Sequence, residues 1–334
     1  MSSFALVFPG QGSQTVGMGR ALVADSPAAA AIFETADEAL GEAISTLAFE
    51  GPEDLLNRTE NAQPALLATS IAYLAAAHER ATREGLTLPN PRFYAGHSMG
   101  QYSAMVASSA LNLPDGVRLV RERGRLMQAS GSGRDGAMAA ILGLDDAQLP
   151  ELVRRASEQG VFAVANRNSP GQVVVSGERT AIEAAAEIAK ELGGKRALVL
   201  PVSVAAHSPL MAEAAEGMRA VLAHVAFREP TAALLANADA RAILDGDGAR
   251  AELVEHLTAG VDWVAAVQRM IEDGVDTFLE VGPGKVLTNL IKRIAPDATA
   301  TAMDDVLAGA GIDLPFLVPT GPGVADQPTR TATT

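Results

Sequence analysis

Gly-His-Ser-Met-Gly at residues 96–100 is the stretch of this chain that decides its fold class. It follows a strand-like run, Arg-Phe-Tyr-Ala at residues 92–95, and leads into an apolar, helix-compatible run at residues 99–107. A strand, a tight turn and a helix around Gly-x-Ser-x-Gly are typical of a nucleophile elbow. The two glycines avoid a collision between strand and helix, and the turn presents Ser98 at the free N–H groups that begin the helix. The alternative is a plain glycine-rich turn without chemistry.

The composition indicates one large globular domain or two smaller ones. The chain has 334 residues, of which 48% are hydrophobic and 20% charged, as is ordinary for a protein with a sizeable core. The absence of cysteine excludes disulfides and thiolate chemistry and fits a reducing compartment, so we expect a cytoplasmic protein. A net charge of −14 argues against a nucleic-acid partner. Neither a signal peptide nor a membrane segment is expected, because the longest apolar run, residues 65–77, is too short.

Alternating strand and helix patterns predict an α/β fold. Residues 4–8, Phe-Ala-Leu-Val-Phe, are continuously apolar, as in a strand buried on both faces of a parallel sheet. We predict an open, mostly parallel sheet with helices on both faces, an α/β-hydrolase-like body formed by residues 1–133 and 202–303. A long helix is expected from Ala65 to Glu84. Residues 304–334, rich in glycine, proline and threonine, are predicted to be a tail that is disordered at its end.

Residues 134–201 have a rhythm of their own. Strand and helix patterns follow one another in the order β-α-β-β-α-β, which is the order of the ferredoxin-like unit. We therefore predict an inserted ferredoxin-like subdomain. The strands are expected at 137–142, 161–166, 172–176 and 196–202, and the helices at 145–159 and 178–192.

A serine nucleophile needs a base, and the chain offers five histidines. His78 and His224 lie in helical stretches and are interpreted as structural, and the side chain of His97 is expected to point away from the serine. His207 follows the end of a strand, where sites of α/β proteins collect, and is the candidate base, although a structural role stays open. His256 lies within a helix and is a weaker candidate.

The residue patterns alone do not identify a carboxylate partner for His207 or a functional arginine. No acid between Ser98 and His207 lies at a predicted strand end, so a serine–histidine dyad with the imidazole oriented by a backbone carbonyl is plausible. The helix over residues 114–128 carries four arginines, a pattern that usually indicates a solvated face. They are Arg118, Arg121, Arg123 and Arg125.

Six motifs stand in one order along roughly residues 1–303, and together they are a strong signal although each alone is weak. They are Phe-Pro-Gly-Gln-Gly-Ser-Gln at 8–14, Gly-His-Ser-Met-Gly at 96–100, Arg-Gly at 123–124, Asn-Ser-Pro-Gly-Gln at 168–172, Pro-Val-Ser-Val at 201–204 with His207, and Glu-Val-Gly-Pro-Gly-Lys-Val-Leu at 280–287. In these motifs the chain closely resembles the malonyl-CoA:acyl carrier protein transacylases, acyltransferases of fatty acid and polyketide synthesis.

The resemblance implies a role for several residues. Ser98 is the nucleophile, His207 the base, and the backbone amides of Gln11 and Met99 form the oxyanion hole. Arg123 holds the malonyl carboxylate, for which the guanidinium is suited because it offers two parallel charge-assisted hydrogen bonds. Two further positions match residues that line the family's pocket, namely Gln63 and Asn166.

The chain also departs from the family pattern. Met99 and Gln101 replace a usual leucine and glutamate, and Ala205-Ala206 stands at positions that touch the acyl pocket, so the choice between malonyl and methylmalonyl stays open. His256 falls where the family often has a glutamine whose main-chain carbonyl orients the catalytic histidine.

The implied reaction is a two-step transfer of malonyl from malonyl-CoA to the phosphopantetheine thiol of acyl carrier protein, by a monomer without metal or bound cofactor. An acidic carrier protein needs a basic patch, for which there are two candidates. One alternative is a serine esterase or thioesterase of the α/β-hydrolase type, which predicts a carboxylate bonded to His207. Another is a non-catalytic module that binds carrier protein. The candidate patches are Lys190, Lys195 and Arg196, or Lys285, Lys292 and Arg293.

Overall fold

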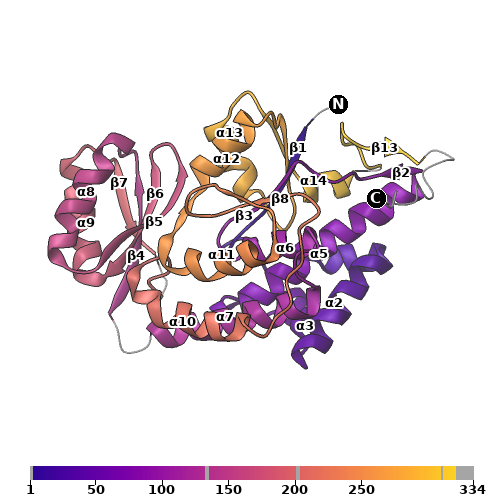
Figure 1. Ribbon diagram of the computed structural model, residues 1–334, viewed down its shortest axis with the longest axis horizontal. Helices are drawn as coiled ribbons and strands as arrows, with labels where there is room; N and C mark the ends of the chain where they lie inside the picture. The colour runs from indigo at the N-terminus through magenta and orange to yellow at the C-terminus, as the bar shows by residue number, and fades with distance from the viewer. Residues whose placement is uncertain (1–2, 132–134, 201–203, 310, 321–334) are drawn as a thin grey trace, which may run out of the picture.

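A six-stranded sheet forms the centre of the larger of two units (Figure 1). The computed structural model describes residues 3–131, 135–200, 204–309 and 311–320. The strand order is β12-β11-β1-β3-β8-β9, and every pair is parallel except β8 with β9. The mostly parallel sheet predicted from the apolar run at residues 4–8 is therefore present. Its strands are β1 (Phe4–Phe8), β3 (Phe93–Gly96), β8 (Ala233–Leu235), β9 (Ala242–Ile243), β11 (Thr277–Glu280) and β12 (Thr299–Ala302).

Helices cover both faces of this sheet. Both faces are apolar, because alternate side chains of β1 belong to two different apolar clusters. Leu6 and Phe8 pack with helices on one face, whereas Ala5 and Val7 pack with helices on the other. The first face is covered by α2 (Pro27–Leu40), α5 (Thr59–Arg83), α6 (Gly100–Ala107), α7 (Leu113–Gly131), α10 (Ala212–Leu222) and α11 (Gly246–Ala259). The second is covered by α12 (Trp263–Glu272) and α13 (Val286–Ile294). The shorter helices α1 (Arg20–Asp25), α3 (Ile44–Glu50) and α4 (Glu53–Leu56) complete the first layer.

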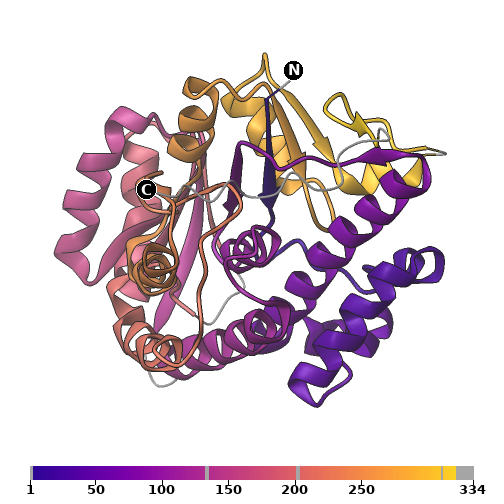
Figure 2. The ribbon, with the colours of Figure 1, turned by 45° about the vertical axis from the view of Figure 1, so that its right-hand side comes forward.

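The smaller unit lies beside the body and has its own sheet, with strand order β10-β5-β6-β4-β7 (Figure 1). Helices α8 and α9 pack on its outer face, as Figure 2 shows from a second side. The opposite face carries Met138 and Val174. Strand β10 comes from the body and pairs with β5, so the two units share a sheet edge. The elements are β4 (Gly136–Leu142), α8 (Leu149–Ala156), β5 (Phe162–Ser169), β6 (Gln172–Glu178), α9 (Arg179–Glu191), β7 (Arg196–Val199) and β10 (Val261–Asp262).

Two predicted boundaries are wrong. Helix α5 begins at Thr59 rather than Ala65, with Pro64 inside it. The proline lacks one hydrogen bond of the helix. The first turn of α5 nevertheless packs closely against α7, since a Cβ on Gly124 of α7 would lie only 2.6 Å from Cα of Glu60. The body also continues beyond residue 303.

The continuation packs on the body through a helix and a strand. After α14 (Met303–Ala308), β13 (Val318–Pro319) pairs antiparallel with β2 (Leu86–Thr87). Phe316 stacks on Phe4, with ring centroids 3.7 Å apart. The predicted disorder at the end of the tail concerns residues 321–334, which lie outside the described residues.

Removing the Phe316 ring tests whether this segment is part of the core. Phe316→Ala should lower the free energy of unfolding by about 3 kcal/mol, because it deletes a buried aromatic ring. Urea unfolding measures the change. Leu244→Ala, at a side chain that is 62% exposed, is the control and should have little effect. Equally small changes in both variants would contradict the packing of residues 311–320.

Candidate active site

The turn between β3 and α6 holds Ser98 in a strained backbone conformation. Its φ of 53° lies in the left-handed region, which non-glycine residues rarely adopt. The flanking glycines are required by contact distances. A Cβ on Gly96 would lie 2.0 Å from the carbonyl carbon of Gly100, and a Cβ on Gly100 would lie 2.2 Å from the carbonyl oxygen of Phe8. The strand, turn and helix of the predicted nucleophile elbow are therefore present.

Asn237 clamps this turn and was not predicted as a functional residue. The backbone N–H of Ser98 donates to its Oδ1 at 2.8 Å, and its Nδ2 donates to the carbonyl of Gly96 at 3.0 Å. The side chain is buried and follows the end of β8. An asparagine directly after a buried strand is the only sequence signal that could have pointed to it.

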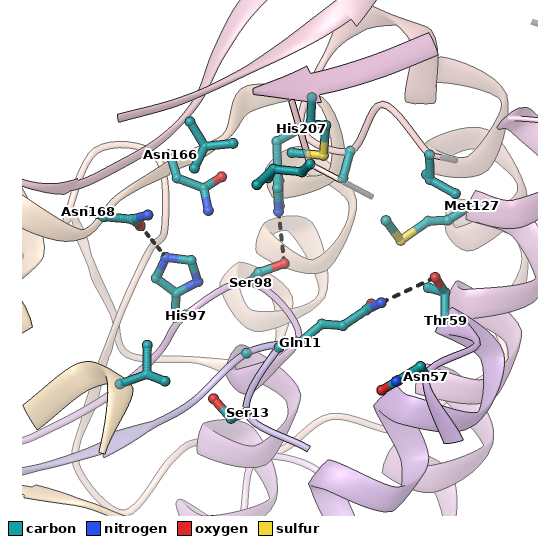
Figure 3. Close-up of a pocket in the computed structure, with 18 of the residues that line it drawn as sticks. Gln11, Ser13, Asn57, Thr59, His97, Ser98, Met127, Asn166, Asn168 and His207 are labelled. Atoms are coloured by element: carbon teal, nitrogen blue, oxygen red, sulfur yellow. Dashed lines mark hydrogen bonds between the residues drawn. The ribbon is translucent and has the colours of Figure 1, made fainter. Parts of the chain in front are cut away.

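His207 meets Ser98 in hydrogen-bonding geometry, as Figure 3 shows. Its Nε2 lies 2.8 Å from Ser98 Oγ, and its Nδ1 donates to the main-chain carbonyl of His256 at 2.6 Å. That carbonyl lies in the last turn of α11, where carbonyls lack partners within the helix. Because Nδ1 faces a carbonyl, which only accepts, Nε2 is the nitrogen with a free lone pair for the serine proton.

Burial and a nearby charge keep His207 neutral. Desolvation, followed by the positive charge of Arg123, lowers its pKa to about 3. The imidazole of His207 is therefore in its neutral form, with the lone pair of Nε2 free, over the ordinary pH range. The negative end of α11 lies at its Nδ1, which favours the imidazolium when it forms.

Arg123 is buried beside Ser98. Its side chain is 1% exposed. Nη1 donates to Gln63 Oε1 at 2.9 Å, and Nη2 lies 3.2 Å from Ser98 Oγ and 3.3 Å from His256 Nε2. The guanidinium forms no ion pair with any residue that the structure describes, and its Nε has no hydrogen-bond partner there. The positive charge of Arg123 thus lies beside Ser98 with no anion next to it among the described residues.

The predicted solvated face of α7 applies to its neighbours but not to Arg123. Arg118 and Arg125 are exposed and pair with acids on their own helix. Arg123 instead lies on the stripe of Val120, Gly124 and Met127, which faces the core at the helical spacing of three and four residues. A charge pattern in the sequence cannot distinguish an arginine on the buried stripe from its neighbours.

A cavity of about 780 Å³ opens between the two units in front of Ser98. The body contributes Gln11, Arg123 and the dyad to its lining. Of the two residues expected to line it, Asn166 does so, and its Oδ1 has no hydrogen-bond partner in the described chain. Gln63 is fully buried behind Arg123 and is not part of the lining. Apolar side chains complete the wall, namely Met127, Met138, Val174, Leu200 and Leu290.

The loop after β1 lies against the elbow. A Cβ on Gly10 would be only 2.6 Å from the carbonyl oxygen of His97. Figure 3 shows Gln11 beside Ser98 in the cavity. The backbone N–H groups of Gln11 and Met99 have no partner among the residues that the structure describes.

The remaining histidines take other places. His97 Nε2 contacts Asn168 Oδ1 at 2.9 Å, away from Ser98 (Figure 3). His78 is exposed on α5, and His224 is exposed in the turn that follows α10. In the described parts of the chain, no three histidine or acidic side chains gather so as to hold a metal ion. No helix within the same ranges is long and apolar enough to cross a membrane.

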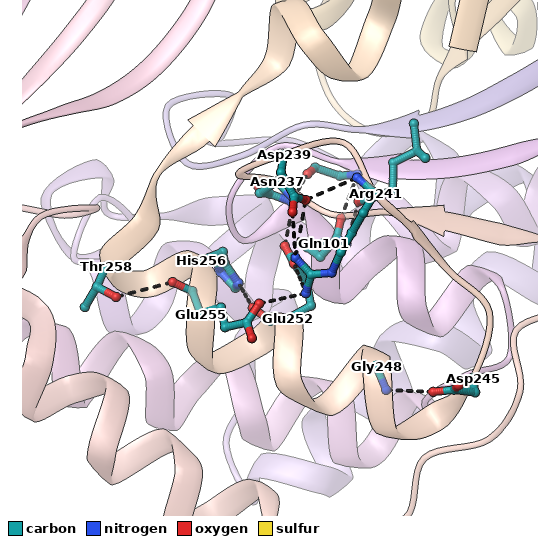
Figure 4. Close-up of polar contacts among 12 residues, drawn as sticks. Gln101, Asn237, Asp239, Arg241, Asp245, Gly248, Glu252, Glu255, His256 and Thr258 are labelled. Atoms are coloured by element: carbon teal, nitrogen blue, oxygen red, sulfur yellow. Dashed lines mark hydrogen bonds and ion pairs between the residues drawn. The ribbon is translucent and has the colours of Figure 1, made fainter. Parts of the chain in front are cut away.

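A buried polar network lies beneath the elbow (Figure 4). The backbone N–H of Asn237 donates to Glu252 Oε1 at 2.7 Å, and Arg241 lies 3.5 Å from Oε2. Burial raises the pKa of Glu252 to about 7. The hydrogen bond from Asn237 and the charge of Arg241 lower this pKa, but their effect is smaller than that of burial. The carboxyl that supports the elbow is therefore partly protonated at neutral pH.

Ser98 and His207 in contact, an imidazole oriented by a main-chain carbonyl, and a buried arginine without an ion-pair partner in the described chain are an arrangement suited to an acyl-transfer enzyme. The chain belongs to the acyl transferase domain family, whose match covers residues 5–309.

Its relatives agree along nearly the whole chain. A malonyl CoA-acyl carrier protein transacylase of Haemophilus influenzae is 43% identical over 318 residues, covering 95% of this chain and 100% of the relative. An acyl carrier protein S-malonyltransferase from Vibrio cholerae has a similar structure, with a TM-score of 0.85, 40% identity, and coverage of 90% of this chain and 96% of that one. A malonyl-transacylase solved in complex with a type II polyketide synthase acyl carrier protein gives a TM-score of 0.84 and 39% identity, covering 90% and 96%.

Glu252→Gln tests the protonation of the buried carboxyl. A folded-state pKa above the unfolded value means that the native protein binds more protons, so this group stabilises the fold below pH 4.5 and loses that contribution as pH rises through 7. The loss amounts to about 3 kcal/mol. The variant, which keeps an acceptor for Asn237, should lack this part of the slope in urea unfolding measured from pH 4.5 to 8.

The matched control is Glu255→Gln. Glu255 pairs with the same Arg241, but its side chain is 54% exposed. This variant should keep most of the pH slope of the native protein, because burial raises the pKa of Glu252 more than the charge of Glu255 does. The same slope in both variants would contradict the raised pKa of Glu252.

Proposed function

We propose that the protein transfers malonyl from malonyl-CoA to the phosphopantetheine thiol of acyl carrier protein, through a malonyl ester on Ser98. The observation that carries the proposal is the buried guanidinium of Arg123, which has no anion beside it in the described chain and whose Nη2 lies 3.2 Å from Ser98 Oγ. Malonyl differs from acetyl by one carboxylate, which is the group that such a guanidinium binds most strongly. A neutral acyl group would leave the buried charge unpaired, a mismatch of about 2–5 kcal/mol.

The first half of the reaction forms the ester. His207 Nε2 takes the proton of Ser98 as Oγ attacks the thioester carbonyl. The developing oxyanion accepts hydrogen bonds from the backbone N–H groups of Gln11 and Met99, which have no other partner in the described chain. The imidazolium, oriented through the carbonyl of His256, then gives its proton to the departing CoA sulfur.

The second half reverses these roles. His207 takes the proton of the pantetheine thiol, and the sulfur attacks the malonyl ester. When the tetrahedral intermediate collapses, Ser98 Oγ leaves and recovers the proton from the imidazolium. Asn166, which lines the cavity and whose Oδ1 has no hydrogen-bond partner in the described chain, is proposed to bind the substrate.

Helix α13 is the proposed docking place for the acidic carrier protein. Val286, Leu287 and Leu290 of this helix line the cavity, and Lys285, Lys292 and Arg293 lie on it or next to it. The other candidate patch, around Lys190, contributes nothing to the cavity wall. We further propose that the protein is a cytoplasmic monomer and that it needs no metal or bound cofactor.

The two units also resemble known fold types. The small unit is proposed to be ferredoxin-like, because β7-β4-β6-β5 is an all-antiparallel order with two helices on one face. The body is proposed to be α/β-hydrolase-like on the strength of its elbow. An esterase of that kind would place a carboxylate at His207 Nδ1, whereas here that nitrogen donates to a carbonyl.

A single-turnover experiment tests the reaction. Radiolabelled malonyl-CoA should label Ser98 with one equivalent, and the label should move to the carrier-protein thiol far faster than to water. Ser98→Ala should abolish labelling and transfer. Transfer that persists in this variant would favour a binding module, and release to water at the rate of release to thiol would favour an esterase.

Arg123→Ala tests the carboxylate site. It should lower kcat/KM for malonyl-CoA about 100-fold or more while changing acetyl transfer much less, because only malonyl loses an ion pair. Arg125→Ala is the control, since Arg125 is exposed on the same helix. Equal losses for malonyl and acetyl would refute the role of Arg123.

A further inference from the structure

We infer that the imidazole of His256 is a positioning residue for substrate selection: it accepts a hydrogen bond from Arg123 and holds the guanidinium beside Ser98. The inference rests on the proposed role of Arg123 and adds a residue that acts through it. It concerns the side chain of His256 and is separate from the part its backbone carbonyl plays toward His207.

The hydrogen bonds of His256 determine its tautomer. Nδ1 lies 2.8 Å from the carbonyl oxygen of Glu252, one turn earlier on α11 (Figure 4). A carbonyl only accepts, so Nδ1 carries the hydrogen and Nε2 has a free lone pair. Arg123 Nη2 lies 3.3 Å from Nε2 and can only donate. The direction of the bond is therefore from Arg123 to His256.

Both side chains are shielded from water. His256 is 0% exposed and Arg123 1%. The ring of Tyr102 packs edge-on to the imidazole and lies under the guanidinium, 5.9 Å from its centre. A guanidinium buried in this way keeps its orientation only if its donors find acceptors, since water cannot replace them.

The acceptors around Arg123 are all uncharged. Gln63 takes a hydrogen bond from Nη1, and Ser98 and His256 take those of Nη2. Of five guanidinium N–H donors, two have no partner in the described chain. An amide, a hydroxyl and a neutral imidazole orient the group without cancelling its charge. A carboxylate in the place of His256 would orient it equally well but would compete with the substrate.

The environment keeps His256 in the accepting form. Burial, and after it the charge of Arg123, hold the pKa of His256 well below the usual range. A protonated His256 would direct an N–H at the donor of Arg123. His256 thus orients two groups: its backbone carbonyl orients the imidazole of His207, and its side chain orients the guanidinium of Arg123.

Replacement by leucine and by glutamine separates these two parts, because both variants keep the backbone carbonyl. His256→Leu removes the acceptor and should raise KM for malonyl-CoA at least 10-fold with little change in kcat, while acetyl transfer changes less than about 3-fold. His256→Gln offers Oε1 to Arg123 and should restore malonyl KM to within about 3-fold of the native value. Steady-state transfer from both thioesters to carrier protein measures this.

Two further variants make the outcome decisive. His256→Phe keeps the ring volume without an acceptor, so it replaces the leucine variant if that one unfolds in a thermal melt. Arg123→Ala is measured in parallel. Loss of malonyl selectivity in Arg123→Ala but not in the leucine or phenylalanine variant would overturn this inference alone. Unchanged selectivity in Arg123→Ala would overturn the proposed carboxylate site. Equal losses of malonyl and acetyl transfer without rescue by glutamine would show a merely structural His256.

Discussion

The buried charge of Arg123 is the constraint on which the site depends. A guanidinium that is 1% exposed and has no anion beside it in the described chain costs folding free energy. The cost is offset by hydrogen bonds to Gln63 on α5, to Ser98 in the elbow and to His256 on α11. Helices far apart in the sequence therefore converge around one side chain, and Ser98 is one of its hydrogen-bond partners.

In the proposed reaction, the charge of Arg123 would act both on the substrate and on the imidazole of His207. Arg123 is the second cause, after burial, that lowers the pKa of His207. A carboxylate bound to Arg123 would offset this effect, so the imidazolium that forms during transfer costs less with malonyl than with a neutral acyl group. In the proposed reaction, selectivity for malonyl would then arise in the proton transfer to His207 as well as in binding. The main-chain carbonyl at Nδ1 suits this arrangement, because it orients the ring without adding a second charge.

The residues that line the cavity come from both units, and several of them follow directly after the ends of neighbouring strands. Phe8 of β1 pairs with Gly96 of β3, so the loop that carries Gln11 and the turn that carries Ser98 leave the sheet at the same edge. The small sheet faces this edge with Met138 and Val174, while α8 and α9 cover its other side. The ester formed on Ser98 would thus lie against apolar side chains rather than open solvent.

The sequence by itself determined the features that depend on near neighbours. The apolar run at residues 4–8, the glycines of the elbow and the N-cap of α2, where Ser26 Oγ accepts from the N–H of Ala29, follow from local sterics and hydrogen bonding. The motifs also indicated that Ser98, His207 and Arg123 meet, and the structure brings them together. Only the tertiary structure decided how they are held. The clamp by Asn237, the place of Gln63 behind Arg123 and the imidazole of His256 arise where separate elements cross, and no local pattern specifies which face of a helix meets another.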